Sequence, residues 1–422
     1  MTTDSVLREV DAPVRAILER ALEGREPELQ DILLLDRVTG PGLAALCAVA
    51  DALRQRQVGP RATYVVNRNI NFTNVCIKAC RFCAFSRTGR SEQGYFLGVD
   101  EIVRRAVEAW SLGATEVCIQ AGLAPGIDPG LYADICRAIK RAAPELAIHA
   151  FSPEEIKYGA GLARTPVRDY LEELKEAGLG SLPGTSAEIL DDELRARIAP
   201  GRIRTVEWLE IVRTAHSIGL PTTATMMYGH VESSEQRARH LTLLRSVQGE
   251  TGGFTEFVPL SFVYEETPMY KRGLVKGLRS GPTSDEVTRV HALARLVLGA
   301  TFRNVQVSWV KVGLEHATAL LRCGANDLGG TLINESISTS AGAAHGQLAS
   351  PRALRRAIRD AGLTPAQRDT RYRVVRAFET APEADAVDAL DRAPVDAFGS
   401  YDELTRDERF RFQKGARSGS PR

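Results

Sequence analysis

The sequence predicts an α/β fold of the TIM type, a full or partial (β/α) barrel with N-terminal helices and a C-terminal extension. Short apolar runs alternate with helical repeats between residues 62 and 322, and strands that alternate with helices form parallel sheets. A doubly wound sheet that binds dinucleotides needs a glycine-rich turn after an early strand, and no early strand here is followed by one. The succession of β/α units therefore favours a barrel.

Two segments are expected to flank the barrel. Residues 1–60 should be helical, with an amphipathic first helix and a further helix over residues 41–53. The barrel is expected to occupy residues 61–350. Residues 351–422 are charged and interrupted by prolines, which predicts a helical extension that ends in a flexible tail at residues 414–422.

Within the barrel segment, predicted strands and helices follow one another in order. The strands are expected at residues 62–74, 114–120, 146–151, 222–229, 254–262 and 304–309. Apolar stripes predict helices over residues 131–139, 166–177, 208–218 and 287–297, and another helix that begins near residue 233. The catalytic and binding residues of such barrels lie at the carboxyl ends of the strands. The site is therefore expected in the loops QAGL, HAFSPEE, PGTSAE, MMYGH and PLSF.

The stretch GGTLINESISTSAGAAHG, at residues 329–346, departs from this alternation. Its glycine, serine and asparagine content is too polar for a buried strand. A polar loop beside the strand ends would suit a cover for the site, and this is the expectation for these residues.

Composition excludes several classes of function. The chain has 54 lysines and arginines against 53 aspartates and glutamates, so no basic surface for nucleic acid is expected. No apolar run reaches the roughly 18 residues that a membrane span requires. The first residues are charged and lack the apolar region of a secretory signal, which predicts a cytoplasmic protein.

Three of the seven cysteines stand close together in NVCIKACRFCAF, directly after the first predicted strand. They are Cys76, Cys80 and Cys83, with the spacing C-x3-C-x2-C. A structural zinc site usually takes four protein ligands, and no further cysteine or histidine pair lies nearby. Three thiolates on a [4Fe–4S] cluster would leave one iron open for a reaction. A zinc site, or a site without a redox role, is the alternative. The other four cysteines are expected to pack as small apolar residues.

The motif resembles that of the radical S-adenosylmethionine (SAM) enzymes, in which an aromatic residue precedes the last cysteine. The matching positions are Cys76, Cys80, Phe82 and Cys83. The resemblance implies a [4Fe–4S] cluster whose open iron binds the amino and carboxylate groups of SAM. It also implies a low-potential electron donor, whose electron cleaves SAM to methionine and a 5′-deoxyadenosyl radical.

Longer blocks resemble one family within that superfamily. YVVNRNINFTNVCIKACRFCAFSR, HAFSPEEI, GLGSLPGTSAEIL, PTTATMMYGH and the stretch at residues 329–346 are similar to the CofH-type enzymes of 5-deazaflavin cofactor biosynthesis. These enzymes are 5-amino-6-(D-ribitylamino)uracil–L-tyrosine 4-hydroxyphenyl transferases. The resemblance covers roughly residues 60–375. Enzymes of the futalosine route to menaquinone share parts of the same blocks and are the alternative.

The resemblance implies a reaction and a partner. The radical removes a hydrogen atom from L-tyrosine, the Cα–Cβ bond breaks, and the 4-hydroxybenzyl group joins C5 of the diaminouracil. A companion radical SAM enzyme of the CofG type then closes the deazaflavin ring. The present chain carries one C-x3-C-x2-C motif, so it would need that companion as a separate protein.

The resemblance also suggests positions for SAM. The superfamily has a Gly-Gly-Glu-like turn after the second strand, where this chain has Gln120, Ala121 and Gly122. Gly122 would permit close backbone approach, whereas Gln120 and Ala121 differ from the pattern. Phe82 is expected near the adenine. Glu188 could bind the ribose hydroxyls or could complement a helix N-terminus.

Further polar residues are candidates for the two substrates, although each could equally make an ordinary structural hydrogen bond. The candidates for the hydroxyl-rich diaminouracil are His149, His230, Asn334, Glu335 and Ser336. Arg68 could clamp the carboxylate of tyrosine or of SAM, or could pair with a glutamate of the barrel. No protein residue is identified as catalytic, because the SAM-derived radical is the reactive species.

The cysteine assignment predicts a clear difference between variants. Replacing Cys76, Cys80 or Cys83 by alanine is expected to abolish cluster loading and turnover, because each change removes a ligand. Iron and sulfide analysis after anaerobic reconstitution measures the loading. Cys118→Ala and Cys136→Ala are the controls and should keep the cluster. Normal iron content and activity in Cys80→Ala would contradict the assignment.

Overall fold

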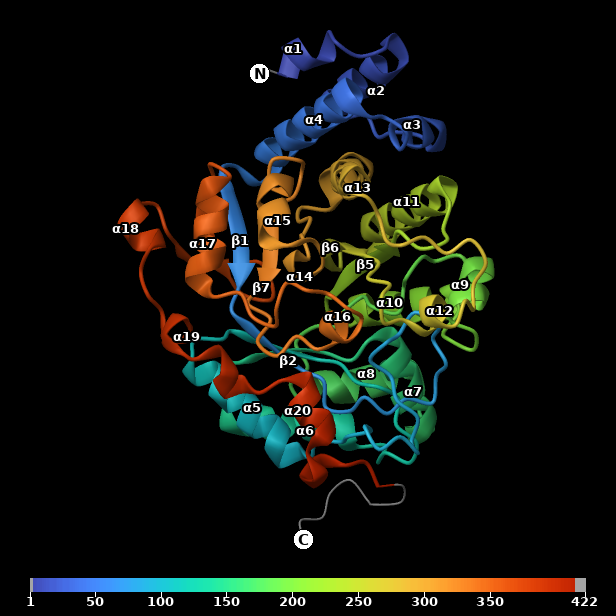
Figure 1. The fold of residues 1–422 in the computed structure, drawn as a ribbon, viewed down its shortest axis with the longest axis vertical. Coiled ribbons are helices and arrows are strands. Elements are labelled where there is room, and N and C mark those ends of the chain that lie inside the picture. Colours follow the sequence, from blue (N-terminus) through green and yellow to red (C-terminus); the bar gives the residue numbers. More distant parts are fainter. Residues whose placement is uncertain (1–2, 414–422) are drawn as a thin grey trace.

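The structure is a computed structural model that describes residues 3–413. Parallel strands surround its centre and helices cover them, with helices α1 to α4 at one end (Figure 1). The tail expected at residues 414–422 lies outside the described residues.

The parallel strands close into a ring. The first predicted strand is divided into β1 (Arg61–Val65) and β2 (Asn67–Ile70). Parallel pairing joins β2 to β3 (Glu116–Ile119), β3 to β4 (Ala147–Ala150), β5 (Thr222–Tyr228) to β6 (Phe254–Ser261), and β1 to β7 (Asp327–Gly330), with a register shift in each of the last two pairs. Single parallel bridges fill the gaps at His149–Ser181, Leu182–Thr222, Phe257–Val305, Gln306–Asp327 and Arg68–Ile333. The predicted barrel is therefore confirmed, in its closed form.

Strand β7 is a feature that the sequence did not indicate. Its residues read DLGG and are all buried, and its last two glycines belong to the stretch expected to be a cover loop. The carboxylate of Asp327 accepts hydrogen bonds from the backbone N–H of Gly329 at 2.6 Å and from Arg368 at 2.6 Å. These bonds compensate the burial of a charged side chain, so a polar sequence can occupy an interior strand.

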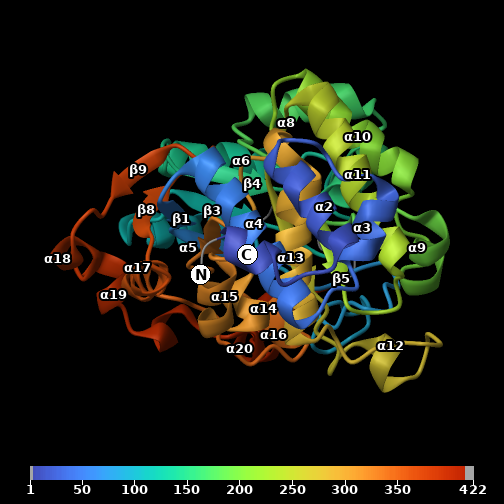
Figure 2. The ribbon, with the colours of Figure 1, turned by 90° about the horizontal axis from the view of Figure 1, so that it is seen from above.

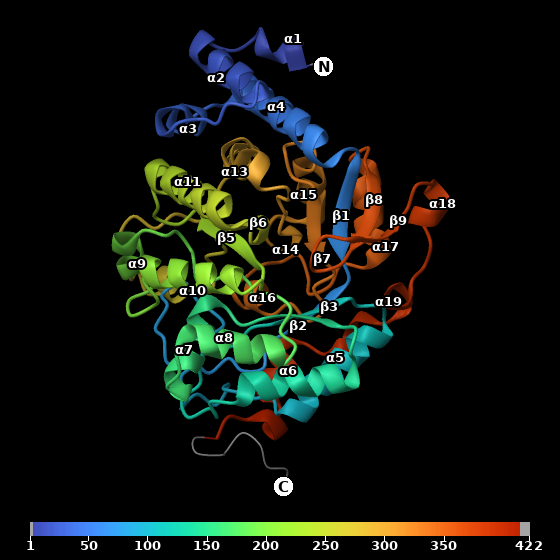
Figure 3. The ribbon, with the colours of Figure 1, turned by 180° about the vertical axis from the view of Figure 1, so that it is seen from behind.

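Helices form the outer layer in three groups, and Figures 2 and 3 show this layer from above and from behind. Beside β2, β3 and β4 lie α5 (Val99–Ser111), α6 (Leu131–Ala142), α7 (Pro153–Ala163) and α8 (Val167–Glu176). Beside β5 and β6 lie α10 (Thr205–Ser217), α11 (Ser234–Thr251) and α13 (Ser284–Leu298). The helices α15 (Leu314–Leu320) and α17 (Pro351–Asp360) cover β7 and β1. Among the described residues no helix is long and apolar enough to cross a membrane.

The N-terminal helices build a second apolar core on the barrel. They are α1 (Thr3–Leu7), α2 (Ala12–Leu22), α3 (Leu29–Leu35) and α4 (Gly40–Val58). Leu18, Leu46 and Val49 are buried in this core together with Ala292 and Leu296 of α13. Because α4 leads directly into β1, these helices lie at the end of the barrel where β1 begins (Figure 1).

The segment after residue 350, expected to be a helical extension, also contributes to the sheet. Strand β8 (Thr364–Arg368) pairs in parallel with β1, and β9 (Val374–Ala377) pairs with β8 in the opposite direction. The short helices α18 (Ala381–Ala384), α19 (Ala389–Arg392) and α20 (Tyr401–Arg406) then run along the outside of the molecule (Figure 1). The sheet thus continues beyond the boundary placed at residue 350.

The end of the described chain holds the loop that follows the cysteines. We call residues 398–412 the C-terminal brace. The Tyr401 hydroxyl donates a hydrogen bond to the carbonyl of Phe85 and accepts one from Asn74, both at 3.2 Å. The backbone N–H of Phe412 donates to Gly94 at 2.8 Å. The brace therefore connects the far end of the chain to the loop at residues 84–96.

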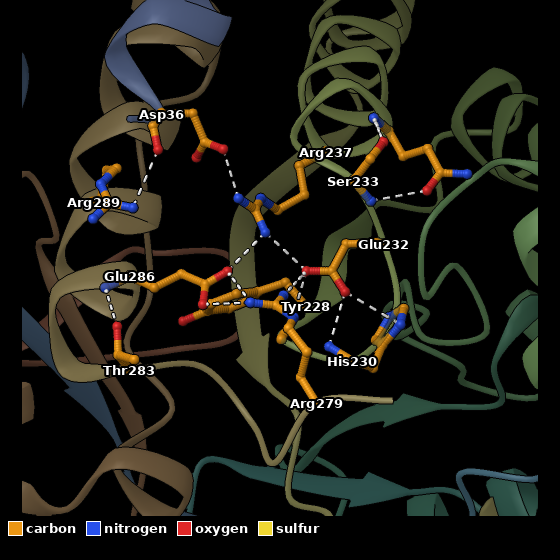
Figure 4. Close-up of polar contacts among 12 residues, drawn as sticks. Asp36, Tyr228, His230, Glu232, Ser233, Arg237, Arg279, Thr283, Glu286 and Arg289 are labelled. Atoms are coloured by element: carbon orange, nitrogen blue, oxygen red, sulfur yellow. Dashed lines mark hydrogen bonds and ion pairs between the residues drawn. The ribbon is translucent and has the colours of Figure 1, made fainter. Parts of the chain in front are cut away.

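A buried group of charges ties the N-terminal helices to the barrel (Figure 4). Its centre is Arg237 on α11, whose guanidinium contacts Asp36 at 2.6 Å, Glu286 at 2.8 Å and Glu232 at 2.9 Å. Arg279 contacts Glu232 and Glu286 as well, each at 2.8 Å. Since Asp36 follows α3 and Glu286 lies on α13, this group joins three parts of the chain that are distant in sequence.

Replacing Arg237 by methionine is expected to lower the free energy of unfolding by about 3–5 kcal/mol, because Asp36 then remains buried without its cation. Glu232 and Glu286 would each keep Arg279. Urea denaturation measures the change. Arg239→Ala is the matched control, since Arg239 is exposed on the same helix and pairs only locally with Glu235, and should shift stability by less than about 0.5 kcal/mol. Equal midpoints for both variants would contradict the role of Arg237.

Candidate active site

A cavity of about 400 Å³ opens among the carboxyl ends of the barrel strands. The residues predicted for the site divide between its wall and the surrounding protein. Those that line it are Cys76, Cys80, Cys83, Phe82, Gln120, Gly122, His149, Glu188 and Glu335. Those that do not are Arg68, His230, Asn334 and Ser336. The structure thus brings the three cysteines and all four predicted SAM positions to one cavity.

The cysteine loop forms neither helix nor regular strand, and neighbouring loops hold its backbone. The N–H groups of Cys76, Ile77 and Arg81 donate to the carbonyls of Arg87, Leu123 and Ile198, each at 2.9 Å. The accepting carbonyls belong to the turn after β3, to the last residue of α9 (Asp192–Ile198) and to the continuation of the cysteine loop itself. The positions of the thiols therefore depend on elements distant in sequence.

Gly122 shows how closely these loops approach. Its N–H donates to Thr73 at 2.8 Å, and a Cβ atom at this position would lie 2.3 Å from the carbonyl oxygen of Val75. That distance is too short for any side chain. The close backbone approach expected of Gly122 is thus made to the cysteine loop, and it lets the turn after β3 pack directly behind the thiols.

Arg202 is the cation nearest to the thiols. Its guanidinium donates to the Cys80 sulfur at 3.2 Å and lies over the Phe82 ring, 5.5 Å from the centroid. Burial raises the pKa of the Cys80 thiol, and Arg202 opposes that shift. Arg202 also faces Glu154 and Glu188, at 3.6 Å each. A cation at this place favours the thiolate, the form that binds metal.

The arrangement of the thiols suits a cluster better than a single ion. All three cysteines are unpaired by disulfide bonds, and burial raises the pKa of each. Among residues 3–413 no three histidine, cysteine or acidic side chains lie close enough together to hold one metal ion. An iron–sulfur cubane binds each thiolate at a different iron, so its three ligands do not have to meet at one ion. Three free thiols that line one cavity fit the ligand set of such a cluster.

The predicted SAM positions adjoin the cysteine end of the cavity. The side chain of Gln120 accepts a hydrogen bond from Thr185 at 3.0 Å. Glu188 has a left-handed backbone, with φ of 43°, and pairs with Arg195 at 3.2 Å. The nearest helix, α9, begins at Asp192 with Asp191 as its cap, so Glu188 is not a helix N-terminal carboxylate.

Two of the predicted substrate residues form a structural pair away from the cavity. Arg68 is buried, and its guanidinium contacts Glu108 and the side-chain oxygen of Asn334, both at 2.6 Å. The amide of Asn334 donates to the carbonyl of Phe398 in the C-terminal brace at 2.8 Å. The alternative considered for Arg68, pairing with a glutamate, therefore describes its contacts.

Of the other predicted substrate residues, two line the cavity and two do not. His149 lines the cavity and contacts the Ser181 hydroxyl at 2.6 Å, and burial lowers its pKa. Glu335 also lines it and accepts from the N–H of Ser338 at 2.8 Å. His230 and Ser336 instead bond to nearby backbone, to Met227 at 3.1 Å and to Asn334 at 2.9 Å.

The end of the cavity away from the cysteines contains charged residues that sequence analysis missed. Arg368 of β8 contacts Asp327 at 2.6 Å and Glu256 of β6 at 3.5 Å. Burial raises the pKa of Glu256 to about 7. Glu116, Gln306 and Lys311 also line the cavity. In the sequence, Glu116 and Glu256 stand as polar residues inside otherwise apolar predicted strands, and this pattern could have indicated that they belong to the site.

Two side-chain oxygens in the cavity wall have no hydrogen-bond partner within the described part of the chain. They are the side-chain oxygens of Asn69 and Thr370, both buried. A buried polar atom without a partner costs free energy unless a ligand or water satisfies it. The cavity wall is therefore prepared for a ligand rich in polar groups.

Comparison with protein families and curated proteins gives consistent results. Residues 70–244 match the radical SAM superfamily, and residues 251–381 match the CofH/MqnC C-terminal region. A 5-amino-6-(D-ribitylamino)uracil–L-tyrosine 4-hydroxyphenyl transferase of Methanothermobacter thermautotrophicus is 47% identical over 86% of this chain and 97% of its own length. The enzyme of that name from Methanocaldococcus jannaschii is 50% identical over 77% of this chain and 91% of its own. FO synthase of Mycobacterium tuberculosis is 46% identical over 82% of this chain, which matches 40% of that protein.

Solved structures share the fold. Methylornithine synthase superimposes with a TM-score of 0.66 and 18% identity, covering 83% of this chain and 97% of its own. The hydrogenase maturase HydG from Carboxydothermus hydrogenoformans gives a TM-score of 0.67 and 15% identity, covering 88% and 83%. At these identities the likeness concerns the barrel alone.

The place of Arg202 predicts the reactivity of Cys80. In metal-free protein, Arg202→Met is expected to raise the pKa of the Cys80 thiol and slow its alkylation by iodoacetamide at pH 8 by about tenfold, the effect of one pKa unit. Peptide mapping by mass spectrometry measures the rate. Glu154 and Glu188 keep Lys78 and Arg195 as partners, so the variant should remain folded. Arg197→Met, an exposed neighbour, is the control, and equal rates in both variants would show that Arg202 does not influence the thiol.

Proposed function

The chain belongs to the radical SAM superfamily and, within it, to the 5-amino-6-(D-ribitylamino)uracil–L-tyrosine 4-hydroxyphenyl transferases, and we propose that the cavity described above carries out this transfer. The protein is accordingly a transferase of 5-deazaflavin cofactor biosynthesis, with a [4Fe–4S] cluster and SAM as cofactors. One observation gives the strongest support for placing the reaction in this cavity. A single cavity is lined by three thiols and by polar side-chain atoms that have no hydrogen-bond partner among the described residues.

Residues at the cysteine end would hold the cofactors. Cys76, Cys80 and Cys83 would bind the cluster, while Phe82 and Glu188 would face SAM beside Arg202. When bound, the two cofactors supply a radical that removes a hydrogen atom from the substrate. Arg202 holds Glu188 and Cys80 in place, and the closely packed turn at Gly122 keeps water from the rear of the cysteine loop.

The remainder of the cavity would hold the two substrates. Breakage of the tyrosine Cα–Cβ bond leaves an imine of glyoxylate, and the 4-hydroxybenzyl group forms a new bond to C5 of the diaminouracil. The ribityl chain of the diaminouracil carries several hydroxyls, which suit the unsatisfied oxygens of Asn69 and Thr370. Glu116, Glu256 and Gln306 would offer further hydrogen-bonding groups at that end.

The proposal also includes a companion enzyme, an electron donor and a cellular location. The chain contains one C-x3-C-x2-C motif and matches 40% of FO synthase, which supports a companion enzyme of the CofG type for ring closure. A low-potential donor would supply the electron. Unpaired cysteines and an iron–sulfur cluster suit the reducing cytoplasm. The relatives' names favour the transferase over the menaquinone-pathway alternative.

The proposal predicts defined products. Anaerobically reconstituted protein with SAM, a strong reductant, L-tyrosine and the diaminouracil should yield 5′-deoxyadenosine and a hydroxybenzyl–uracil adduct by mass spectrometry. Omitting tyrosine is the control and should abolish the adduct. Deoxyadenosine without adduct would reject the transferase activity and direct attention to menaquinone-type substrates.

A further inference from the structure

Four cationic side chains line the cavity, and they differ in their partners. Lys78 pairs with Glu154 at 3.1 Å, Arg202 contacts Cys80 at 3.2 Å, and Arg368 contacts Asp327 at 2.6 Å. Within residues 3–413, the ammonium group of Lys311 makes no hydrogen bond and no ion pair, whereas its backbone N–H donates to the carbonyl of Ser308 at 3.0 Å. The cavity therefore contains one cation whose charge other described side chains do not compensate by direct contact.

The position of Lys311 is defined by the barrel and by the segment that follows β7. It lies on α14 (Trp309–Val312), directly after the strand segment that contains Gln306, and it is only partly exposed. Ser338 of α16 (Ile337–Ser340) and Glu335 line the same part of the cavity. Burial lowers the pKa of Lys311, whereas the carboxylate of Glu335 raises it. An ammonium group in such a place is stabilised when an anion binds beside it.

The substrates differ in whether they can supply that anion. The diaminouracil carries no carboxylate. The carboxylate of SAM would bind at the cysteine end of the cavity, beside the cluster. L-tyrosine provides the remaining carboxylate, and its ammonium group would find a counter-charge in Glu335.

We propose that Lys311 binds the α-carboxylate of L-tyrosine, with Glu335 facing the ammonium group. This inference rests on the proposed function and assigns one end of the cavity to the amino-acid head of the substrate. Arg368, another cation of the cavity wall, already contacts two carboxylates, those of Asp327 and Glu256. Lys311 also takes the role that the sequence suggested for Arg68, which lies outside the cavity.

The assignment agrees with the chemistry of the transfer. When the Cα–Cβ bond breaks, the carboxylate stays with the glyoxylate imine. Lys311 would therefore keep hold of the fragment that is released. The 4-hydroxybenzyl fragment would have no bond to Lys311 and could move toward C5 of the diaminouracil.

Equilibrium dialysis of labelled L-tyrosine against the anaerobically reconstituted, SAM-loaded protein tests the proposal. Lys311→Met is expected to weaken tyrosine binding by about 10- to 100-fold, the range for a charge-assisted hydrogen bond. Lys311→Arg should restore most of the affinity, because it restores the cation. Lys276→Met is the matched control, since Lys276 is exposed and does not line the cavity, and should bind as the unchanged protein does.

A second ligand separates direct contact from damage to the cavity. Tyramine lacks the carboxylate, so the unchanged protein and Lys311→Met should bind it equally. Equal loss of tyramine and tyrosine affinity, or unchanged tyrosine affinity, in Lys311→Met would overturn the proposal. If the unchanged protein forms the hydroxybenzyl adduct while Lys311→Met binds tyrosine normally, only this inference fails. If the unchanged protein forms no adduct, the proposed function fails with it.

Discussion

The backbone of an irregular loop must satisfy its hydrogen bonds outside any helix or sheet, and in this protein that requirement positions the cysteine loop. The N–H groups of Cys76, Ile77 and Arg81 reach carbonyls in three different places. Gly122 permits one of the partner turns to lie against Val75. Closure of the barrel brings these turns together, so the thiol positions and the barrel depend on the same geometry.

Charge is distributed along the cavity in compensated groups, with one exception. At the cysteine end, Arg202 contacts Glu154, Glu188 and Cys80. Away from the cysteines, Arg368 contacts Asp327 and Glu256. Such groups limit the cost of burying charge and hold the side chains in one arrangement. Because these cations are occupied, Lys311 stands out as a group suited to an external anion.

The barrel and the cysteine cluster could be predicted from the sequence because both depend on patterns among neighbouring residues. Apolar alternation is a property of neighbouring residues, and so is the spacing C-x3-C-x2-C. Contacts between distant segments carry no such pattern. For Arg68 the sequence therefore left open a substrate carboxylate or a glutamate partner, and the fold supplies Glu108 as that partner. The polar strand β7 was missed because its partner Arg368 lies in β8. Lys311 and Arg202 belong to no motif, and only the fold places them beside the cavity.

The C-terminal brace has a consequence for the order of events during synthesis. Tyr401 and Phe412 contact Phe85 and Gly94, so the loop after the cysteines depends on residues that the ribosome adds much later than the cysteines themselves. A nascent chain that already contains the three cysteines lacks this support until residues 398–412 have been synthesised. The thiols therefore emerge first in a loop that is only partly held, and the C-terminal brace closes around them afterwards.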